Sequence, residues 1–414
     1  MVTLLLLVIY VAFISLGLPD ALLGVAWPIM QVDYAVPVSL AGLVSMTISV
    51  NTIISSVLSG RILKRFGTGR VTFVSVLMTA TALLGFSIAP SFIWLVLLAI
   101  PLGLGAGSVD AGLNDYVSKN YAASHMNWLH SFWGVGAMSG PIILSQFISN
   151  SDSWRNGYLT VAILQFTLVI ILFFTLPLWT KVAHHKPNME VDSDEKPEQT
   201  DTPNTNFIRS VLSPLRIKGV TPVLVVFFLY CGIEWTMGLW GSSFLVNVKG
   251  IDVATAALWV SLYYGSITFG RFVSGFVAMR VNGKTIIRIG EITILAGIVT
   301  MLLPLPDIFS MFGFILVGLG CAPIFPTMLH ETPARFGNED SQNIMGFQMA
   351  VAYIGTSVLP PLFGLIASIM TFSIFPFVLL GFIAIMLFNS EQVNKFMARK
   401  QTLNSEPYRS AIVN

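Results

Sequence analysis

Long apolar stretches recur along the whole chain and are separated by short polar or Gly/Pro-containing segments. Twelve of them are long enough for a membrane-spanning helix, which takes about 20 predominantly apolar residues. A helix bonds all of its backbone groups internally, so it is the form in which such stretches cross lipid. The pattern therefore predicts an all-α polytopic membrane protein with twelve transmembrane helices, centred near residues 16, 49, 80, 104, 138, 166, 233, 264, 295, 318, 356 and 380.

One long polar segment, residues 181–218, interrupts this pattern after the sixth apolar stretch. It contains proline and mixes acidic with basic residues, which is typical of a segment too polar to form a core of its own. The sequence therefore predicts a six-helix bundle at 1–180 and a flexible cytoplasmic linker at 181–218. A second six-helix bundle follows at 219–392, and a cytoplasmic tail at 393–414.

The two predicted bundles resemble each other weakly in sequence, at an offset of 214 to 215 residues that lengthens in the later helices. The matched pairs are Gly103–Gly105 with Gly318–Gly320, Asp20 with Glu234, Gly24 with Gly238, Gly136 with Gly355 and Pro141 with Pro360. Internal repeats of this size are typical of secondary transporters, in which the substrate site lies near mid-membrane between the repeats.

Composition and charge agree with a membrane protein. Only 10% of the residues are charged and 55% are hydrophobic, whereas soluble domains carry about 25% charged residues. If the N-terminus is cytoplasmic, all of the 22 Lys and Arg residues except Arg155 and Lys249 fall in loops and helix ends on the same side, Arg271 among them. This bias marks the cytoplasmic face. We expect a multi-pass protein of the cell (plasma) membrane with both termini in the cytoplasm.

Three acidic residues, Asp20, Asp110 and Glu234, lie inside apolar stretches. A charge at the bilayer centre costs about 2.5–3.5 kcal/mol on insertion scales, so such residues usually face a cavity or a partner. Removal from water disfavours the charged form, which suits a carboxyl group that binds and releases protons. With no basic residue expected at their depth, the sequence favours proton coupling over a structural role, although Glu234 could bind substrate without titrating.

Depth along the helices separates the two acids of the first half. At a rise of 1.5 Å per residue, Asp110 lies about 12 Å above the cytoplasmic end of its helix and Asp20 about twice as far. We therefore expect two separate proton sites. Asn114 lies one helical turn from Asp110 on the same face.

Further polar and aromatic side chains in the apolar stretches are candidates for binding substrate. Asparagine offers a donor and an acceptor together, which suits sugar hydroxyls. Aromatic rings could stack against a sugar, although such rings also pack helices together. His130 could contact the substrate or instead be bonded to a neighbouring carbonyl. The candidates are Asn51, Asn114, Asn127, His130, Trp133, Trp240, Tyr263, Gln348 and Tyr353.

The loop SGRILKRFGTGR, residues 59–70, resembles the basic loop between the second and third helices of the major facilitator superfamily. It departs from that pattern at Lys64, where an aspartate is usual. The resemblance extends over essentially the full chain and implies the major facilitator fold, with two pseudo-symmetric six-helix bundles.

Four segments resemble the fucose:proton symporter family of sugar permeases more closely, namely 103–117, 127–137, 228–240 and 322–329. That family carries an acidic residue followed four positions later by asparagine, and the segment 103–117 has Asp110 and Asn114 at this spacing. Asp20 matches the first-helix aspartate of the family. The resemblance implies that Asp20 and Asp110 take part in proton coupling and sugar binding. His130 and Trp133 replace amide side chains, so the sugar need not be fucose.

Function classes can be compared on these residues. The sequence has no metal-ligand cluster and no nucleophile–base motif, which argues against an enzyme. A proton-coupled symporter of a sugar or a similar small polar solute is favoured by the line of polar residues in the spans. The alternative is a proton-driven efflux antiporter for drugs or lipophilic compounds, because GAMSGP at 136–141 partly resembles an antiporter signature. We expect protons and the lipid bilayer as partners, no cofactor, no nucleic acid, and a monomer.

Overall fold

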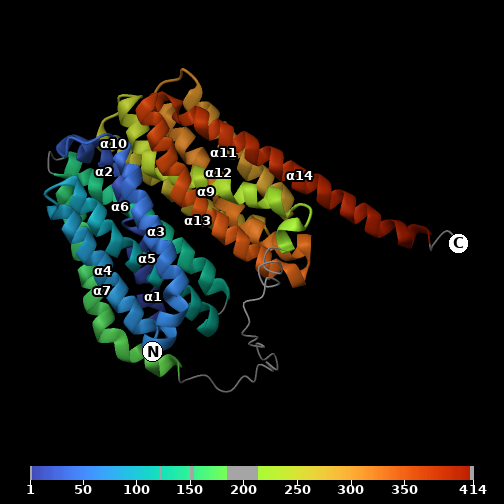
Figure 1. Ribbon diagram of the computed structural model, residues 1–414, viewed down its shortest axis with the longest axis horizontal. Helices are drawn as coiled ribbons and strands as arrows, with labels where there is room; N and C mark the ends of the chain where they lie inside the picture. The colour runs from blue at the N-terminus through green and yellow to red at the C-terminus, as the bar shows by residue number, and fades with distance from the viewer. Residues whose placement is uncertain (1, 122, 150–152, 184–212, 411–414) are drawn as a thin grey trace.

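The computed structural model describes residues 2–121, 123–149, 153–183 and 213–410, and these residues form helices joined by short turns (Figure 1). The N-terminal half contains α1 (Val2–Gly17), α2 (Leu22–Asp33), α3 (Leu40–Phe66), α4 (Thr68–Ile88), α5 (Phe92–Asn120), α6 (Ala123–Ser149) and α7 (Trp154–Ala183). The C-terminal half contains η1 (Ser213–Arg216), α9 (Val220–Asn247), α10 (Val253–Val277), α11 (Gly283–Leu302), α12 (Ile308–Phe336), α13 (Asn338–Ile369), η2 (Phe372–Ile374) and α14 (Phe375–Ser410).

The helices confirm the predicted fold class. Within the described residues, ten elements are long and apolar enough to cross a membrane, with α1 and α2 counted together as one span. The other two long helices are α6 and α10, which pack against each other between the two halves. Each of the twelve predicted centres therefore lies in its own helix.

Two bundles stand side by side in Figure 1, one from α1 to α7 in blue to green and one from α9 to α14 in yellow to red. Contacts between them run from α2 to α9 and α10, from α6 to α10, and from α3 to α13. The Ser261 hydroxyl on α10 donates to the carbonyl of Met138 on α6 at 2.9 Å. The halves meet directly in the middle of the molecule.

Close helix contacts repeat in the two halves at the predicted offset. Gly103 packs on the carbonyl of Ile48, and Gly318 packs on the carbonyl of Tyr263, with no room for a Cβ at either position. Because Gly103 and Ile48 each lie 215 residues before their counterparts, the same helix approach is made twice. The weak sequence repeat therefore corresponds to a repeat in packing.

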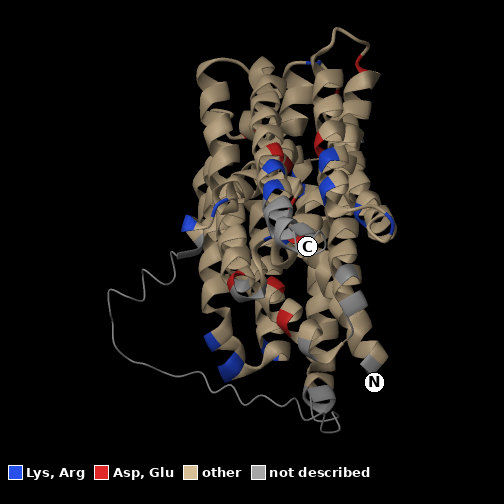
Figure 2. Ribbon diagram, turned by 90° about the vertical axis from the view of Figure 1, so that its right-hand side faces the viewer, with Lys and Arg blue, Asp and Glu red and all other residues tan. Residues whose placement is uncertain are grey.

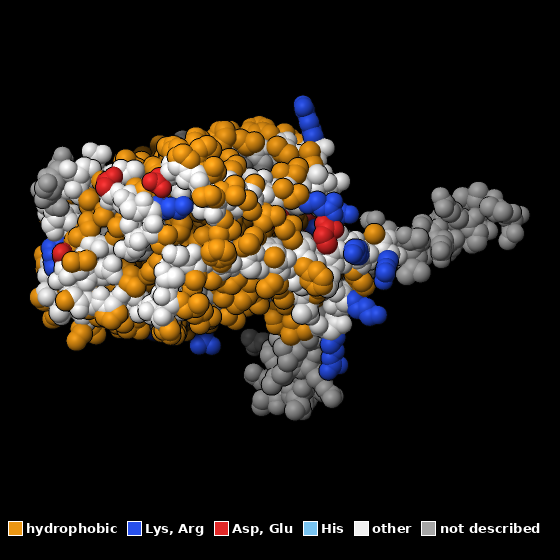
Figure 3. All heavy atoms as spheres, turned by 90° about the horizontal axis from the view of Figure 1, so that it is seen from above, with side chains coloured by type: hydrophobic (Ala, Val, Ile, Leu, Met, Phe, Trp, Pro, Cys, Tyr) orange, Lys and Arg blue, Asp and Glu red, His pale blue; other side chains and the backbone are white. Residues whose placement is uncertain are grey.

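The surface around the bundles is apolar. Large side chains such as Val57, Phe174 and Ile369 are 77%, 73% and 78% exposed. Hydrophobic side chains cover the sides of the molecule in Figure 3, while Lys and Arg gather mainly at the end from which α14 projects. Charged residues are few along the helices themselves (Figure 2). A surface of this kind fits contact with lipid rather than water.

Two helices run past the predicted segment boundaries. Helix α7 extends past residue 180 to Ala183, and most of the predicted linker, residues 184–212, lies outside the described residues. The predicted boundary at 392/393 falls inside α14, which continues to Ser410. Helices α3 and α4 are separated by Gly67 alone, whose φ of +77° is in the region that favours glycine.

Candidate substrate and proton site

Asp20 lies in a break in the first span, between α1 and α2. Pro19 directly precedes it, and proline removes a backbone donor and disfavours helical geometry at the residue before it. The chain turns here through short-range bonds, from the Asp20 N–H to the Gly17 carbonyl at 3.2 Å and from the Leu22 N–H to the Pro19 carbonyl at 3.1 Å. The Oδ2 atom of Asp20 accepts a hydrogen bond from the Trp133 indole N–H at 2.7 Å.

Asp110 and Asn114 lie one turn apart on α5. The Asn114 Nδ2 group donates to Oδ1 of Asp110 at 2.9 Å and to the Asp110 carbonyl at 3.0 Å. Oδ1 of Asn114 is buried and accepts no hydrogen bond from any described group. Buried polar atoms of this kind are normally satisfied, so this acceptor calls for a water or substrate donor.

Glu234 on α9 pairs with Arg271 on α10. Oε1 of Glu234 lies 3.2 Å from the Arg271 Nη2 atom, and the two side chains are 10% and 21% exposed. The expectation that no basic residue lies at the depth of Glu234 is therefore wrong. The position of Arg271 in the sequence predicts a cytoplasmic helix end, but α10 continues past it to Val277, and the Arg271 side chain pairs with Glu234 of α9.

Trp133 on α6 links Asp20 to the Arg271–Glu234 pair. Its indole N–H bonds to Asp20, and the Arg271 guanidinium carbon lies 5.5 Å from the centre of its ring. Tyr264 lies edge-on to the same ring at 6.5 Å. A continuous path therefore runs from Asp20 through the indole and the guanidinium to Glu234, and it crosses from the N-terminal to the C-terminal half.

Several other predicted residues lie around this path. Asn51 is half-buried on α3 and bonds to the Thr47 carbonyl at 2.8 Å. His130 is exposed on α6, edge-on to the Phe13 ring at 5.8 Å, and within the electrostatic reach of Arg271. Tyr353 is half-buried on α13.

Tyr353 brings the C-terminal half close to the second acid. Its hydroxyl lies next to Ser56 on α3, and its side chain lies within electrostatic reach of Asp110. Asp20 and Asp110 are also close enough for their charges to interact, although each has its own hydrogen-bond partner. Asn127 is part of α6, but its side chain lies outside the described part of the chain.

Three predicted substrate residues lie instead in the packed interior of the C-terminal half. Trp240 is fully buried, donates to the Pro360 carbonyl at 2.7 Å and packs against aromatic rings. Gln348 is fully buried and accepts from the Thr332 hydroxyl at 3.1 Å. Tyr263 is fully buried and donates to the Glu234 carbonyl at 3.0 Å. The structure does not bring these side chains to the partly buried polar residues around Asp20.

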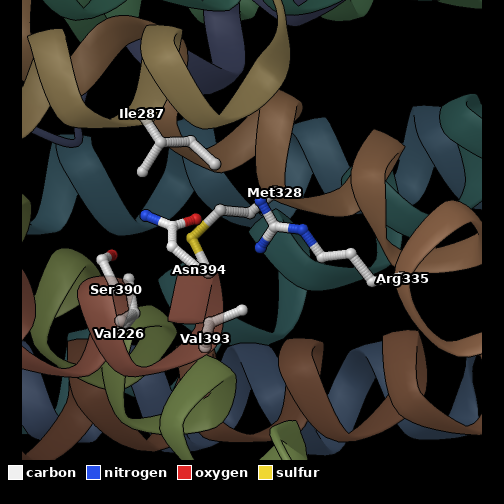
Figure 4. Close-up of a pocket in the computed structure, with 7 residues that line it drawn as sticks. All are labelled: Val226, Ile287, Met328, Arg335, Ser390, Val393 and Asn394. Atoms are coloured by element: carbon white, nitrogen blue, oxygen red, sulfur yellow. The ribbon is translucent and has the colours of Figure 1, made fainter. Parts of the chain in front are cut away.

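A further buried acid was not identified from the sequence. Glu291 on α11 is fully buried; one carboxylate oxygen accepts from Ser390 on α14, and the other has no partner among the described groups. Its position inside the ninth apolar stretch is the same signal that identified Asp20. Ser390 also lines a small hollow with Arg335 and Asn394 (Figure 4). The hollow has room for about one water molecule.

The described residues contain no group of three or more His, Cys, Asp or Glu side chains that could hold a metal ion. Cys231 and Cys321 are free and buried. The polar groups gathered near Asp20 are carboxyl groups, amides, an indole N–H and a guanidinium.

Comparison with known proteins agrees with the fold. The model of the Major Facilitator Superfamily matches residues 9–360. The glucose/mannose transporter GlcP of Bacillus subtilis is 23% identical over 271 residues, which are 64% of this chain and 64% of that protein. The hexuronate transporter of the same organism is 24% identical over 68% of this chain and 66% of its own length. The matches thus span slightly less than two thirds of these relatives.

Solved structures show the same architecture. The nucleoside transporter NupG superposes with a TM-score of 0.73 at 13% identity, covering 93% of this chain and 98% of that one. A bacterial homologue of the human lysosomal transporter Spinster, in an inward-facing and occupied conformation, gives a TM-score of 0.68 at 11% identity, with 96% and 97% covered. At these identities the likeness concerns the fold alone.

Proposed function

Because this chain belongs to the Major Facilitator Superfamily, we propose that it is a proton-coupled symporter of a sugar or a similar small polar solute. Like the members of its family and its relatives, it is a multi-pass membrane transport protein and not an enzyme. In the proposed cycle, solute and proton bind between the two halves, which then rock to open on the other side. The glucose/mannose and hexuronate transporters among its relatives support a polar cargo.

One observation carries the proposal: two acids, Asp20 and Asp110, lie near the contact between the halves beside polar groups that are only partly buried. A packed structural carboxylate would be enclosed by fixed donors. Here each acid has one side-chain donor, Trp133 for Asp20 and Asn114 for Asp110. Either carboxyl group can gain a proton without breaking an ion pair.

The proposed roles follow the geometry. Asp20 and Asp110 carry protons, and Glu234 is held as a charged partner of Arg271. Solute hydroxyls bond to the unpaired Oδ1 of Asn114 and to the neighbouring polar groups, with Trp133 beside them. The other proposed contacts are Asn51, Asn127, His130 and Tyr353.

Trp240, Tyr263 and Gln348 hold the helices of the C-terminal half in place. The protein acts as a monomer in the plasma membrane, with both termini in the cytoplasm, in keeping with the basic loops.

Uptake into proteoliposomes under an imposed proton gradient tests the function. A panel of neutral hexoses, deoxyhexoses, amino sugars and hexuronates would be offered to the unchanged chain, to Asp110→Asn and to Asp252→Asn. Asp252 is an exposed helix cap that asparagine can replace, so its variant is a matched control.

The unchanged chain and the control should accumulate at least one of these solutes. Asp110→Asn should exchange that solute across the membrane but fail to accumulate it, because a neutral amide cannot carry the proton. Accumulation that survives in Asp110→Asn would remove Asp110 from the mechanism. Proton-driven export of lipophilic dyes, with no uptake of any sugar, would replace the proposal with the efflux antiporter.

A further inference from the structure

The indole of Trp133 lies between the acids of the two halves. It lies on α6, which packs against α10 of the other half. The indole N–H points to Asp20 at 2.7 Å, and its ring face lies under the guanidinium of Arg271 at 5.5 Å. A single side chain thus contacts a proton-binding candidate of one half and the cation of the other.

Arg271 extends this link to the acid that corresponds to Asp20 in the repeat. Asp20 and Glu234 are matched at the offset of the two halves, and Arg271 pairs with Glu234 at 3.2 Å. The equivalent acids of the two repeats are therefore joined through one indole and one guanidinium. Nothing in the proposed roles of Asp20 and Asp110 accounts for this arrangement.

The link changes strength when Asp20 gains a proton. A hydrogen bond to a carboxylate is about twice as strong as one between neutral groups. The ring that donates this bond also lies against the Arg271 guanidinium, so a weaker bond to Asp20 frees the ring to move relative to the cation. Protonation of Asp20 therefore weakens its hold on the indole and leaves Arg271 paired with Glu234.

The charged and titratable groups facing Asp20 are few among the described residues. Helix α6 contributes Trp133 and, near Arg271, His130. Helix α10 contributes Tyr264, which lies within electrostatic reach of both Asp20 and Glu234. Arg271 on α10 interacts with Glu234 and Tyr230 of α9, on the other side of the Trp133 ring. Helix α5 contributes Asp110. Among these described groups, it is the Trp133 indole that donates a hydrogen bond to the Asp20 carboxylate.

We propose that Trp133 and Arg271 transmit the proton state of Asp20 to the C-terminal half. With Asp20 charged, the link holds α6 and α10 together; with Asp20 protonated, the link loosens and the halves can move. Trp133 and Arg271 are positioning residues, which act through Asp20 and Glu234. The inference rests on the proposed function, because it assigns Asp20 a proton that is bound and released during transport.

Trp133→Phe tests the link with little change of shape, since it keeps a ring under Arg271 and removes only the N–H donor and part of the ring. Trp128→Phe is the matched control, because Trp128 lies on the same helix, is 57% exposed and contacts neither acid in the described structure. Each variant is measured in proteoliposomes for gradient-driven accumulation and for exchange without a gradient, over a range of pH.

Trp133→Phe should lower the accumulation ratio about tenfold, which corresponds to about 1.4 kcal/mol of coupling. Exchange should persist, and its pH profile should move up by about one pH unit, because loss of the donor favours protonated Asp20. In an Asp20→Asn background, Trp133→Phe should have no further effect on the pH profile, since the two changes break the same link. A purely structural Trp133 would lower both activities equally and leave the pH profile in place.

A conformational measurement separates the inference from the function. Spin labels at Lys64→Cys and Met279→Cys, both exposed and in different halves, report the distance between the bundles without any solute. The native cysteines are buried and should not be labelled. The unchanged background and Trp128→Phe should show a distance distribution that shifts with pH, and in Trp133→Phe that shift should be much smaller.

A pH-dependent distance shift of unchanged size in Trp133→Phe overturns the link even if the protein transports sugar. If the unchanged chain accumulates no solute under a proton gradient, the proposed function fails instead, whatever the spin labels report.

Discussion

Gly24 of α2 faces Gly238 of α9 backbone to backbone, and a Cβ on Gly24 would lie against the Gly238 carbonyl. These two glycines are matched in the sequence repeat, each four residues after an acid, Asp20 or Glu234. The two halves therefore touch at equivalent points directly beside the proposed proton pathway. Gly24 and Gly238 lie this close in the conformation of the structure. When the halves move to open the other side of the membrane, this contact must loosen.

Gly24→Ala should therefore impair transport more than folding. The added methyl group would clash with the backbone atoms of Gly238 and Leu239. Overpacking of this kind costs about 1–3 kcal/mol. The cost falls on the conformation in which the halves touch, so we expect exchange of solute to fall about tenfold. Gly60→Ala is the control, because nothing lies within 4 Å of its added Cβ. Equal exchange by the two variants would mean that this contact does not limit the cycle.

Removing Arg271 should destabilise the protein through Glu234. Arg271→Gln leaves a mostly buried carboxylate without its cation, and breaking such a pair costs about 3–5 kcal/mol. The double variant Arg271→Gln with Glu234→Gln removes both charges and should recover much of the loss. Thermal unfolding in detergent of the two single variants and the double variant gives the coupling between the residues. Additive effects would show that the pair at 3.2 Å contributes no interaction energy.

Trp240→Phe should lower stability without changing the affinity for solute. The indole is fully buried and its N–H satisfies the Pro360 carbonyl. Loss of that donor removes a buried hydrogen bond, at a cost of about 0.5–1.5 kcal/mol. The melting temperature should fall while the KM of uptake stays that of the unchanged chain. A raised KM at unchanged stability would return Trp240 to the substrate site.

The stability that the Asp252 N-cap of α10 contributes should decrease in acid. Hydrogen bonds from the side chain and the backbone N–H of Thr255, the latter at 3.0 Å, hold the pKa of Asp252 below its ordinary 3.8. A lowered pKa in the folded state adds stability that is present above about pH 4 and is lost as the pH falls through the folded value. Melting curves of the unchanged chain and Asp252→Ala should differ at neutral pH, by about 1 kcal/mol, and converge in acid. A difference that does not vary with pH would show that the charge of the cap is unimportant.

The sequence alone determined the parts of this protein that depend on lipid. Twelve helices, two six-helix halves and the positions of Asp20, Asp110 and Glu234 could be predicted, because apolar runs of spanning length have one stable form in a bilayer and an acid within them stands out. The pairing of Asp110 with Asn114 was also predictable, since four residues make one helical turn.

The tertiary structure decided which groups meet. Arg271 could be counted by its charge but not matched to Glu234, because the rotation and depth of α10 against α9 depend on packing between helices far apart in the sequence. Trp133 and Trp240 are the same residue type inside apolar stretches, yet one faces the contact between the halves and the other is enclosed by aromatic rings. A sequence fixes which side chains share a face of one helix, whereas the partner of that face is set only when the helices pack.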